Sequence, residues 1–247
     1  MISYKPMSDK PSVRSPWFWV PSLYFAQGIP YVAVMIVSVL MYKRLGVSNT
    51  DIALYTSWLN LPWVIKPFWS PFVDLLKTKR WWVVTMQLLI GAGLAGVAFT
   101  IPTTFFFQAS LAVFWLLAFS SATHDIAADG FYMLALDSHE QAFFVGIRST
   151  FYRIAIIAGQ GVLVMFAGFL ENSTGNIPLA WSVTFFILGG LFLALFLYHR
   201  YILPLPKGDK PSATVTPSTI LKEFFATFAS FFKKKQAFVA ILRSEER

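Results

Sequence analysis

The sequence FFFQASLAVFWLLAFSSATHDIAADG, residues 105–130, is the most informative part of this chain. It exceeds the about 20 mostly apolar residues that a helix needs to cross the roughly 30 Å hydrocarbon core of a bilayer. Towards its end it carries His124, Asp125 and Asp129. A charge in hydrocarbon costs at least about 2.5 kcal/mol, so such groups usually serve a function. The sequence therefore predicts a membrane helix with one functional face.

Five further apolar runs have the length of a membrane span, and together the six predict an all-α membrane protein. The predicted spans are residues 17–42, 51–73, 81–101, 105–130, 143–169 and 180–201. The composition agrees, because 56% of the 247 residues are hydrophobic and 13% are charged, against about 25% charged residues in soluble domains. The chain has no cysteine, which excludes disulfides, thiol catalysis and cysteine-ligated metal.

The net charge of +8 follows membrane topology and is not a nucleic-acid footprint. Lys and Arg gather in the N-terminal tail, between the second and third spans, and after the sixth span. The positive-inside rule then puts both termini in the cytoplasm, in agreement with an even number of spans. The expected parts are a cytoplasmic tail (1–16), a six-helix bundle (17–201), a cytoplasmic linker (202–219) and a C-terminal segment (220–247).

The C-terminal segment has its own pattern. Apolar residues recur at helical spacing between 220 and 238, beside Lys222 and a run of three lysines at 233–235. This favours an amphipathic helix on the inner membrane face, with a soluble helix docked on protein as the alternative. The apolar stretch from 237 to 242 is too short to span and reads as the start of a seventh helix.

Deep polar side chains are unevenly distributed over the spans. Spans one, two, four and five carry them, whereas span three offers chiefly Gln87, which we expect to reach water near the cytoplasmic end. Two polar spans followed by one apolar span occur twice, as in the repeats of secondary transporters. We therefore predict a three-plus-three bundle in which spans three and six face lipid. The small residues from Gly91 to Gly96 predict close helix approach.

Spans one and two each hold a candidate binding residue. Gln27 lies about 15 Å into its span, and Gly28 and Pro30 follow it, which indicates either an interrupted helix at a substrate site or a kink for packing. Lys66 lies about 12 Å from Asp74 at the end of its span, too deep to snorkel fully. Pairing with a carboxylate or holding an anionic substrate is the favoured role.

In span four, Asp125 and Asp129 share a helical face, with His124 about 100° away. Three roles are open for the acids: ion pairs with Arg148 and Arg153 as a clamp or cytoplasmic gate, a proton relay helped by His124, or a divalent metal site. The position near the cytoplasmic mouth favours the gate. A metal site lacks further ligands, so neither a metal nor a cofactor is predicted.

Span five offers Arg153 and Gln160, which are seven residues apart and share a face. An arginine inside a bundle suits carboxylate or phosphate groups of a substrate. Pairing with an acid of span four is the alternative role for this arginine. Gly159 and Gly161 flank Gln160 and predict close approach of another helix.

Two motifs give the chain a family resemblance. LPWVIKPFWSPFVD at 61–74 and ATHDIAADG at 122–130 resemble the second-helix and fourth-helix segments of AmpG-type muropeptide permeases, in which Gln is more frequent at the position of His124. The second motif is also similar to that of acetyl-coenzyme A transporters. Both belong to the peptide, acetyl-CoA and drug transporter group of the major facilitator superfamily.

The superfamily's loop motif between helices two and three is also recognisable. Asp74, Lys79 and Arg80 resemble it, with Ser70 in place of its usual glycine. The resemblance covers about residues 17–242. Family members have at least twelve helices in two halves, so this chain resembles the N-terminal half, and a missing C-terminal half or a second copy is implied as its partner.

The resemblance implies a proton-coupled symporter in the bacterial inner membrane that imports anhydro-muropeptides for peptidoglycan recycling. Its partners would be a muropeptide-like small molecule, protons and the lipid bilayer, and no nucleic acid. The implied roles are substrate binding for Gln27, Lys66, Arg153 and Gln160, a cytoplasmic gate or proton relay for His124, Asp125, Asp129 and Arg148, and a cytoplasmic lock for Asp74, Lys79 and Arg80.

Other functions remain open. Acyl-CoA or drug-like cargo suits the same superfamily. An intramembrane prenyltransferase-like enzyme would use the Asp125/Asp129 pair but needs a second acidic cluster on another helix, and the predicted spans five and six contain no acid. A half-size protein that dimerises to complete the bundle is a third class. We expect a transporter and not an enzyme.

Overall fold

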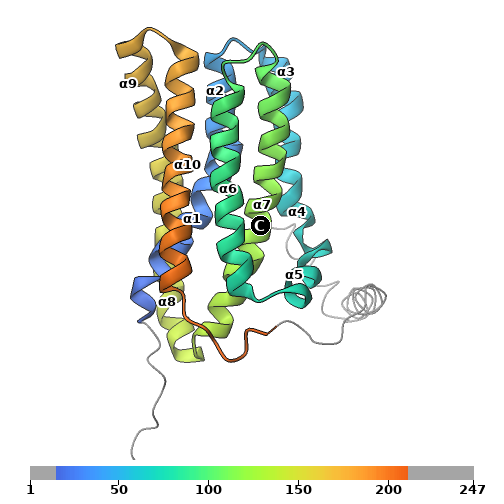
Figure 1. Ribbon diagram of the computed structural model, residues 1–247, viewed down its shortest axis with the longest axis vertical. Coiled ribbons are helices and arrows are strands. Elements are labelled where there is room, and N and C mark those ends of the chain that lie inside the picture. The colour runs from blue at the N-terminus through green and yellow to red at the C-terminus, as the bar shows by residue number, and fades with distance from the viewer. Residues whose placement is uncertain (1–14, 211–247) are drawn as a thin grey trace, which may run out of the picture.

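The computed structural model describes residues 15–210, which fold into an upright bundle of helices (Figure 1). The described residues form α-helices with short 3₁₀ and π-helical turns and contain no strand, so the predicted all-α class is confirmed. The start and the end of this part of the chain emerge at the same end of the bundle (Figure 1). Most of the N-terminal tail and the amphipathic helix expected at 220–238 lie outside the described residues.

The first span is one long rod at the centre of the bundle. It is the most buried of the five long helices, because α7, α8 and α10 all pack against it. Pro30 lies inside the rod without ending it, and the helix is interrupted a few residues later by a π-turn. The rod consists of η1 (Pro16–Phe18), α1 (Val20–Val32), η2 (Ala33–Val37) and α2 (Ser38–Arg44).

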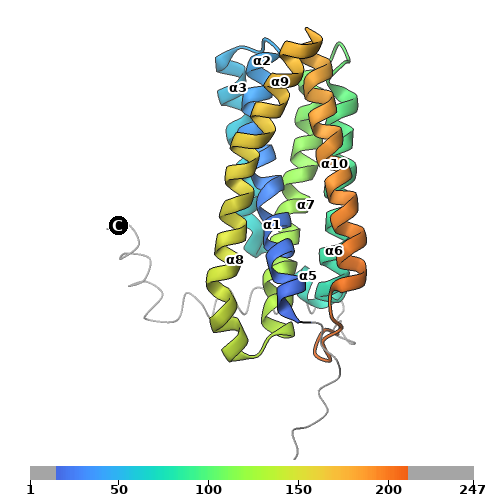
Figure 2. The ribbon, with the colours of Figure 1, turned by 90° about the vertical axis from the view of Figure 1, so that its left-hand side faces the viewer.

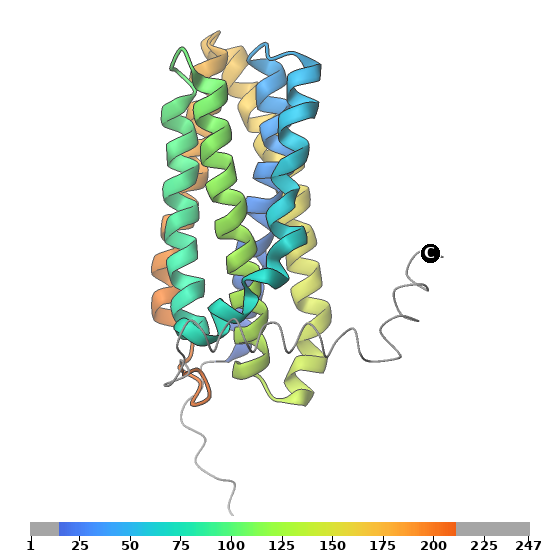
Figure 3. The ribbon, with the colours of Figure 1, turned by 90° about the vertical axis from the view of Figure 1, so that its right-hand side faces the viewer.

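The second predicted span is divided into five short segments. Pro62, Pro67 and Pro71 are each the second residue of a new segment. Their missing N–H groups are tolerated in the first turn of a helix, but a proline cannot continue the helix that precedes it. This segmented rod (49–76) runs beside α7, and its last segment turns aside at the lower end (Figure 3). The segments are α3 (Asn49–Thr56), η3 (Ser57–Asn60), α4 (Leu61–Ile65), η4 (Lys66–Phe68) and α5 (Ser70–Leu76).

Four more rods complete the bundle, so that five helices of the described part have the length and composition to cross a membrane. Thr78, Asp137 and Asn176 cap three of them by accepting backbone N–H groups. The fifth rod extends beyond the predicted span 143–169 at both ends, and the added turns contain Glu140 and Glu171. The rods are α6 (Lys79–Thr100), α7 (Phe106–Ala135), α8 (Ser138–Ala158) with η5 (Gly159–Leu163) and α9 (Val164–Thr174), and α10 (Ile177–Ile202).

Helices α6 and α10 form an outer pair on the side of the bundle away from α8 (Figure 2). A Cβ added at Gly189 would lie 3.1 Å from the carbonyl oxygen of Gly91, so the glycines allow close approach of the two backbones, as predicted. The exposed side chains from 81 to 99 on α6 and from 179 to 197 on α10 are all apolar. This surface suits contact with lipid.

Candidate functional site

Two polar pockets lie on the side of the bundle formed by α1, α7, α8 and the segmented rod. The first has a volume of about 530 Å³, and its polar lining is Lys66, Ser70, Asp74, Lys79 and Asp129. The second has a volume of about 280 Å³ and is lined by Tyr24, Gln27, Arg148, Ser149, Tyr152 and Arg153. Seven of the predicted site residues therefore line these two pockets.

Asp129 lines the first pocket and contacts two residues that line the second. Its Oδ1 accepts a hydrogen bond from the Tyr24 hydroxyl at 3.0 Å and lies 3.5 Å from Nη2 of Arg148. The Arg148 guanidinium lies over the rings of Tyr24 and Tyr132, at 4.8 and 5.1 Å from their centroids, so cation–π attraction adds to the ion pair. The cluster connects α1, α7 and α8. It is the arrangement expected of a clamp between spans four and five, and its role as a gate remains a prediction.

Asp125 occupies a different environment, although it shares a helical face with Asp129. Its side chain is buried, and the positive charge of Lys66 acts on it. The side chains of Gln27 and Trp63 also approach it. Yet Oδ1 of Asp125, Oε1 of Gln27 and Nε1 of Trp63 are buried without a hydrogen-bond partner among residues 15–210. Each such atom costs about 1–3 kcal/mol, so a polar ligand placed among them would relieve that cost.

Arg153 and Gln160 are both exposed. Arg153 lines the second pocket and forms no ion pair with a carboxylate of residues 15–210, so the alternative of pairing with an acid of span four is not seen. Gly159 packs against Val32 of α1, whereas nothing lies within 4 Å of a Cβ added at Gly161. Only the first of the two glycines serves close approach.

The predicted loop motif lies between α5 and α6. Asp74 forms an ion pair with Lys79, whose aliphatic stem packs against Gly130, where an added Cβ would lie 2.9 Å from Cε of the lysine. This contact gives a physical reason for the glycine that ends the ATHDIAADG motif. Arg80 does not join this ion pair. It donates to backbone carbonyl oxygens at the end of α10, that of Leu203, at 3.2 Å, and that of Arg200.

The linker takes part in this motif through Asp209. Its carboxylate accepts the backbone N–H groups of Lys79 and Arg80 at 2.6 and 3.0 Å. A carboxylate at a helix N-terminus is stabilised by the helix dipole and by these two bonds. The role of Asp209 could not be predicted from the sequence, because no local pattern relates it to a helix that begins 130 residues earlier.

His124 lies on another side of α7 and belongs to a hydrogen-bonded chain that includes neither Asp125 nor Asp129. Its Nε2 is 3.1 Å from Nε2 of Gln87, whose Oε1 is 3.0 Å from Nδ1 of His199, and Nε2 of that histidine is 3.0 Å from Oγ of Ser22. This buried chain joins α7, α6, α10 and α1. Gln87 is fully buried, so the expectation that it reaches water is wrong: α10 covers it. The deep position of His199 was not recognised from the sequence.

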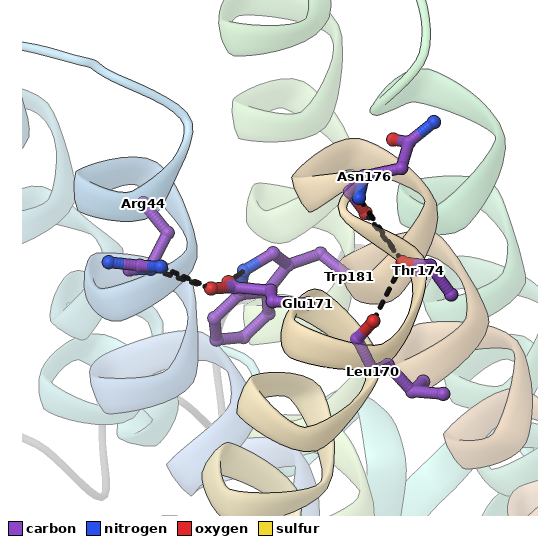
Figure 4. Close-up of polar contacts among 6 residues, drawn as sticks. All are labelled: Arg44, Leu170, Glu171, Thr174, Asn176 and Trp181. Atoms are coloured by element: carbon purple, nitrogen blue, oxygen red, sulfur yellow. Dashed lines mark hydrogen bonds and ion pairs between the residues drawn. The ribbon is translucent and has the colours of Figure 1, made fainter.

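At the opposite end of the bundle, Glu171 connects three spans (Figure 4). Arg44 of α2 forms an ion pair with its carboxylate and donates through Nε at 2.9 Å. Trp181 of α10 donates from Nε1 to the other carboxylate oxygen at 2.7 Å. Thr174 accepts the backbone N–H of Asn176 at 3.2 Å and so fixes the turn between α9 and α10. Spans one, five and six are thereby held together at this end.

The sequence profile of the BT1 family matches residues 25–241. The chain belongs to the BT1 family. Among curated relatives of this BT1-family chain, "Putative transporter AmpG 4" of Rickettsia conorii is 28% identical over 239 residues, which cover 89% of the chain and 53% of that protein. "Anhydromuropeptide permease" of Escherichia coli K12 is 24% identical over 228 residues, which cover 89% of the chain and 43% of that protein.

These relatives confirm the predicted resemblance to AmpG-type permeases. The two relatives are named as a transporter and a permease, and the all-α bundle of the BT1-family chain agrees with one half of a major-facilitator fold. It spans about half the length of the curated relatives it matches. Among residues 15–210, no group of three or more His, Asp or Glu side chains is placed to hold a metal ion.

Proposed function

We propose that this chain forms the N-terminal half of a secondary transporter that imports anhydro-muropeptides together with protons. The observation that carries the proposal is that Lys66 and Gln27, which line the first and the second pocket, both interact with the buried carboxylate of Asp125. The helices of Gln27 and Lys66 are interrupted nearby, at the π-turn η2 and the 3₁₀ turn η4. Interrupted helices with polar groups between them are typical of substrate sites in secondary transporters. The names of the two relatives support the same class of function.

The two pockets suit an anionic, strongly polar cargo. Lys66 lines the first and Arg153 the second, and Gln27 adds to the second an amide group that can both donate and accept hydrogen bonds. Gln160 offers a further amide that is exposed outside both pockets. Arginine binds a carboxylate with two parallel N–H groups, and a muropeptide offers carboxylates. The phosphates of an acyl-CoA would attract the same cations, so acyl-CoA, with drug-like compounds, is the comparison cargo in the test below.

Asp125 and Asp129 take separate parts in this proposal. Asp129, paired with Arg148 and Tyr24, holds α7 to α8 on the path to the cytoplasm. A proton delivered to Asp129 would remove its attraction to Arg148 and so loosen this contact. Asp125 balances the charge of Lys66 until an anionic substrate arrives. His124 belongs to a buried chain with Gln87 and has no direct part in either step.

The basic end of the bundle faces the cytoplasm of a bacterium in this proposal. Lys77, Arg80, Arg200 and Lys207 lie at this end, whereas Arg44 at the opposite end is paired with Glu171. The positive-inside rule then places both ends of residues 15–210 on the cytoplasmic side of the inner membrane. A partner half, or a second copy of this chain, would close the pockets from the side of α8.

The test is uptake of radiolabelled anhydro-muropeptide into proteoliposomes under an inward proton gradient. It compares the chain alone with the product of the whole reading frame, should that frame continue beyond Arg247. We expect uptake to collapse with the gradient and to be lost in Lys66→Ala and Asp125→Asn, while Lys207→Ala, an exposed lysine outside both pockets, keeps it. Uptake that survives both pocket variants would contradict the proposed site. Stronger competition by acetyl-CoA or a drug-like cation than by unlabelled muropeptide would contradict the proposed cargo.

A further inference from the structure

A third cavity, separate from the proposed transport site, lies on the outer pair at the basic end of the bundle. It has a volume of about 560 Å³ and lies between the lower ends of α6 and α10, and it shares no lining residue with the two polar pockets. The segment after α10 passes beneath these helix ends (Figure 1) and closes the cavity with Leu205 and Asp209. We call this cavity the outer groove.

The chemistry of the outer groove changes along its length. Val84, Leu88 and Phe196 line the part that lies further into the bundle, and Arg80 and Arg200 line the part nearest the helix ends. Two turns of α6, about 12 Å, separate Arg80 from Leu88, and one turn of α10, about 6 Å, separates Arg200 from Phe196. The groove is therefore apolar at membrane depth and cationic where headgroups lie.

Aromatic side chains flank the groove at the same level. Trp81 is 43% exposed and Tyr201 is 70% exposed, and both belong to the lining. Exposed Trp and Tyr are typical of the boundary between the hydrocarbon and the headgroups. The exposed side chains beyond them, along both helices, are apolar. A ligand in this groove therefore lies in the membrane and not in the aqueous crevice.

The charge of the groove favours an anion. Two guanidinium groups stand against one carboxylate, that of Asp209, which is directed at the N–H groups that begin α6. Arg80 is held in place by the carbonyl oxygens of Leu203 and Arg200. The Arg200 side chain is exposed and forms no ion pair with an acid of residues 15–210. It is the cation that a ligand can reach.

We propose that the outer groove binds one anionic phospholipid, with its phosphate at Arg200 and one acyl chain along Val84, Leu88 and Phe196. The apolar depth distinguishes this ligand from a free phosphate, and the arginines distinguish it from a zwitterionic lipid. Bound there, the lipid would contact α6, α10 and the segment 203–209 at once. The proposal rests on the membrane fold and does not depend on what the protein transports.

Native mass spectrometry of the purified chain in detergent tests the proposal. Phosphatidylglycerol and phosphatidylethanolamine with identical acyl chains are the lipid probes, and glycerol phosphate and inorganic phosphate are the soluble probes. We expect phosphatidylglycerol to bind about fivefold more tightly than phosphatidylethanolamine, the gain from about one reachable basic residue. Neither soluble probe is expected to displace the lipid at the same concentration.

Two variants and a control locate the site. Arg200→Gln should reduce phosphatidylglycerol binding to the level of phosphatidylethanolamine, and Lys207→Gln, which removes another exposed charge outside the groove, should not. Thr85→Trp fills the groove without changing its charge and should reduce the binding of phosphatidylglycerol. Equal binding of the two lipids, equal effects of the two Gln variants, or displacement by inorganic phosphate would each overturn the proposal. Melting temperatures near that of the wild type show that the variants are folded.

Discussion

Two donors from different helices converge on a single carboxylate oxygen of Asp129. Tyr24 donates a hydrogen bond to it, and Arg148 approaches it while stacking on Tyr24 and Tyr132. The side chains of the ion pair are 31% and 38% exposed, so water weakens their attraction and the pair contributes little to stability. The cluster is therefore better suited to a contact that opens and closes than to a permanent brace.

We expect Arg148→Gln to separate these two roles. Its melting temperature in detergent should stay close to that of the wild type, because partly exposed ion pairs contribute about 0–1 kcal/mol. Proton-driven uptake should fall strongly, since Asp129 would lose the cation that responds to its protonation. Arg148→Lys, which keeps the charge, is the matched control and should retain part of the uptake. Normal uptake by Arg148→Gln would show that the pair is not a gate.

The buried chain from Ser22 through His199 and Gln87 to His124 predicts the opposite behaviour. Gln87→Leu should lower the free energy of unfolding by about 1–3 kcal/mol, because it removes the hydrogen-bond partner of the buried His124 and leaves His199 with Ser22 alone. Gln108→Leu is the matched control, since Gln108 is exposed on α7. Thermal unfolding in detergent measures the difference. Equal melting temperatures for the two variants would exclude a stabilising role for the chain.

Among the helices, the first and fifth rods are paired through their interruptions. Each contains a π-helical turn, η2 and η5, and the two turns contact each other. Gly159, at the start of η5, lies directly against Val32, at the end of α1. π-turns insert an extra residue into a helix and occur frequently at functional sites. Here η2 connects α1 to α2 and η5 connects α8 to α9, so both turns lie where the contact between α1 and α8 ends.

This contact predicts a sharp difference between two neighbouring glycines. A Cβ at Gly159 would lie 2.1 Å from Cγ1 of Val32, whereas one at Gly161 meets nothing within 4 Å. Gly159→Ala should destabilise the protein by about 1–3 kcal/mol, as overpacking does, and Gly161→Ala should not. Adding Val32→Ala to Gly159→Ala should restore much of the loss. Thermal unfolding of the four proteins checks this, and a neutral Gly159→Ala would show that the rods separate easily here.

Across the bundle, the polar and apolar surfaces lie on different sides. Arg153 and Gln160 are exposed on the rod α8–α9, and they are accompanied by exposed apolar residues such as Ile157, which is 70% exposed. A surface of mixed character suits burial against a second protein bundle better than contact with lipid alone. The outer pair, by contrast, exposes only apolar groups at membrane depth.

Cysteine crosslinking in native membranes tests which side meets a partner, and the chain has no cysteine of its own. We expect Ile157→Cys to form crosslinked species with a second copy or with a partner half. Phe99→Cys, at a similarly exposed position on the outer pair, is the control and should remain uncrosslinked. Crosslinking at Phe99→Cys alone would place the partner on the opposite side. Mass analysis of the product from Ile157→Cys distinguishes a second copy from another chain.

Local composition was enough to predict the membrane class, the rods and all the charged residues that line the two polar pockets. A membrane-spanning helix can be predicted by comparing the length of an apolar run with the thickness of a bilayer, and this comparison requires no knowledge of tertiary contacts. The same holds for Lys66 and Arg153, because a charge at membrane depth stands out in the sequence alone. Even the division of the second rod has a local cause, in Pro62, Pro67 and Pro71.

Partners distant along the chain were beyond the reach of such patterns. Asp125 and Asp129 share a helical face, yet one lies near Lys66 and the other binds Arg148, because different rods pack over them. Gln87 is buried because α10 covers it. Asp209 caps α6, a helix that begins 130 residues before it. A side chain's exposure and partner depend on how the rods pack, and helix periodicity fixes only the direction in which each side chain leaves its own rod.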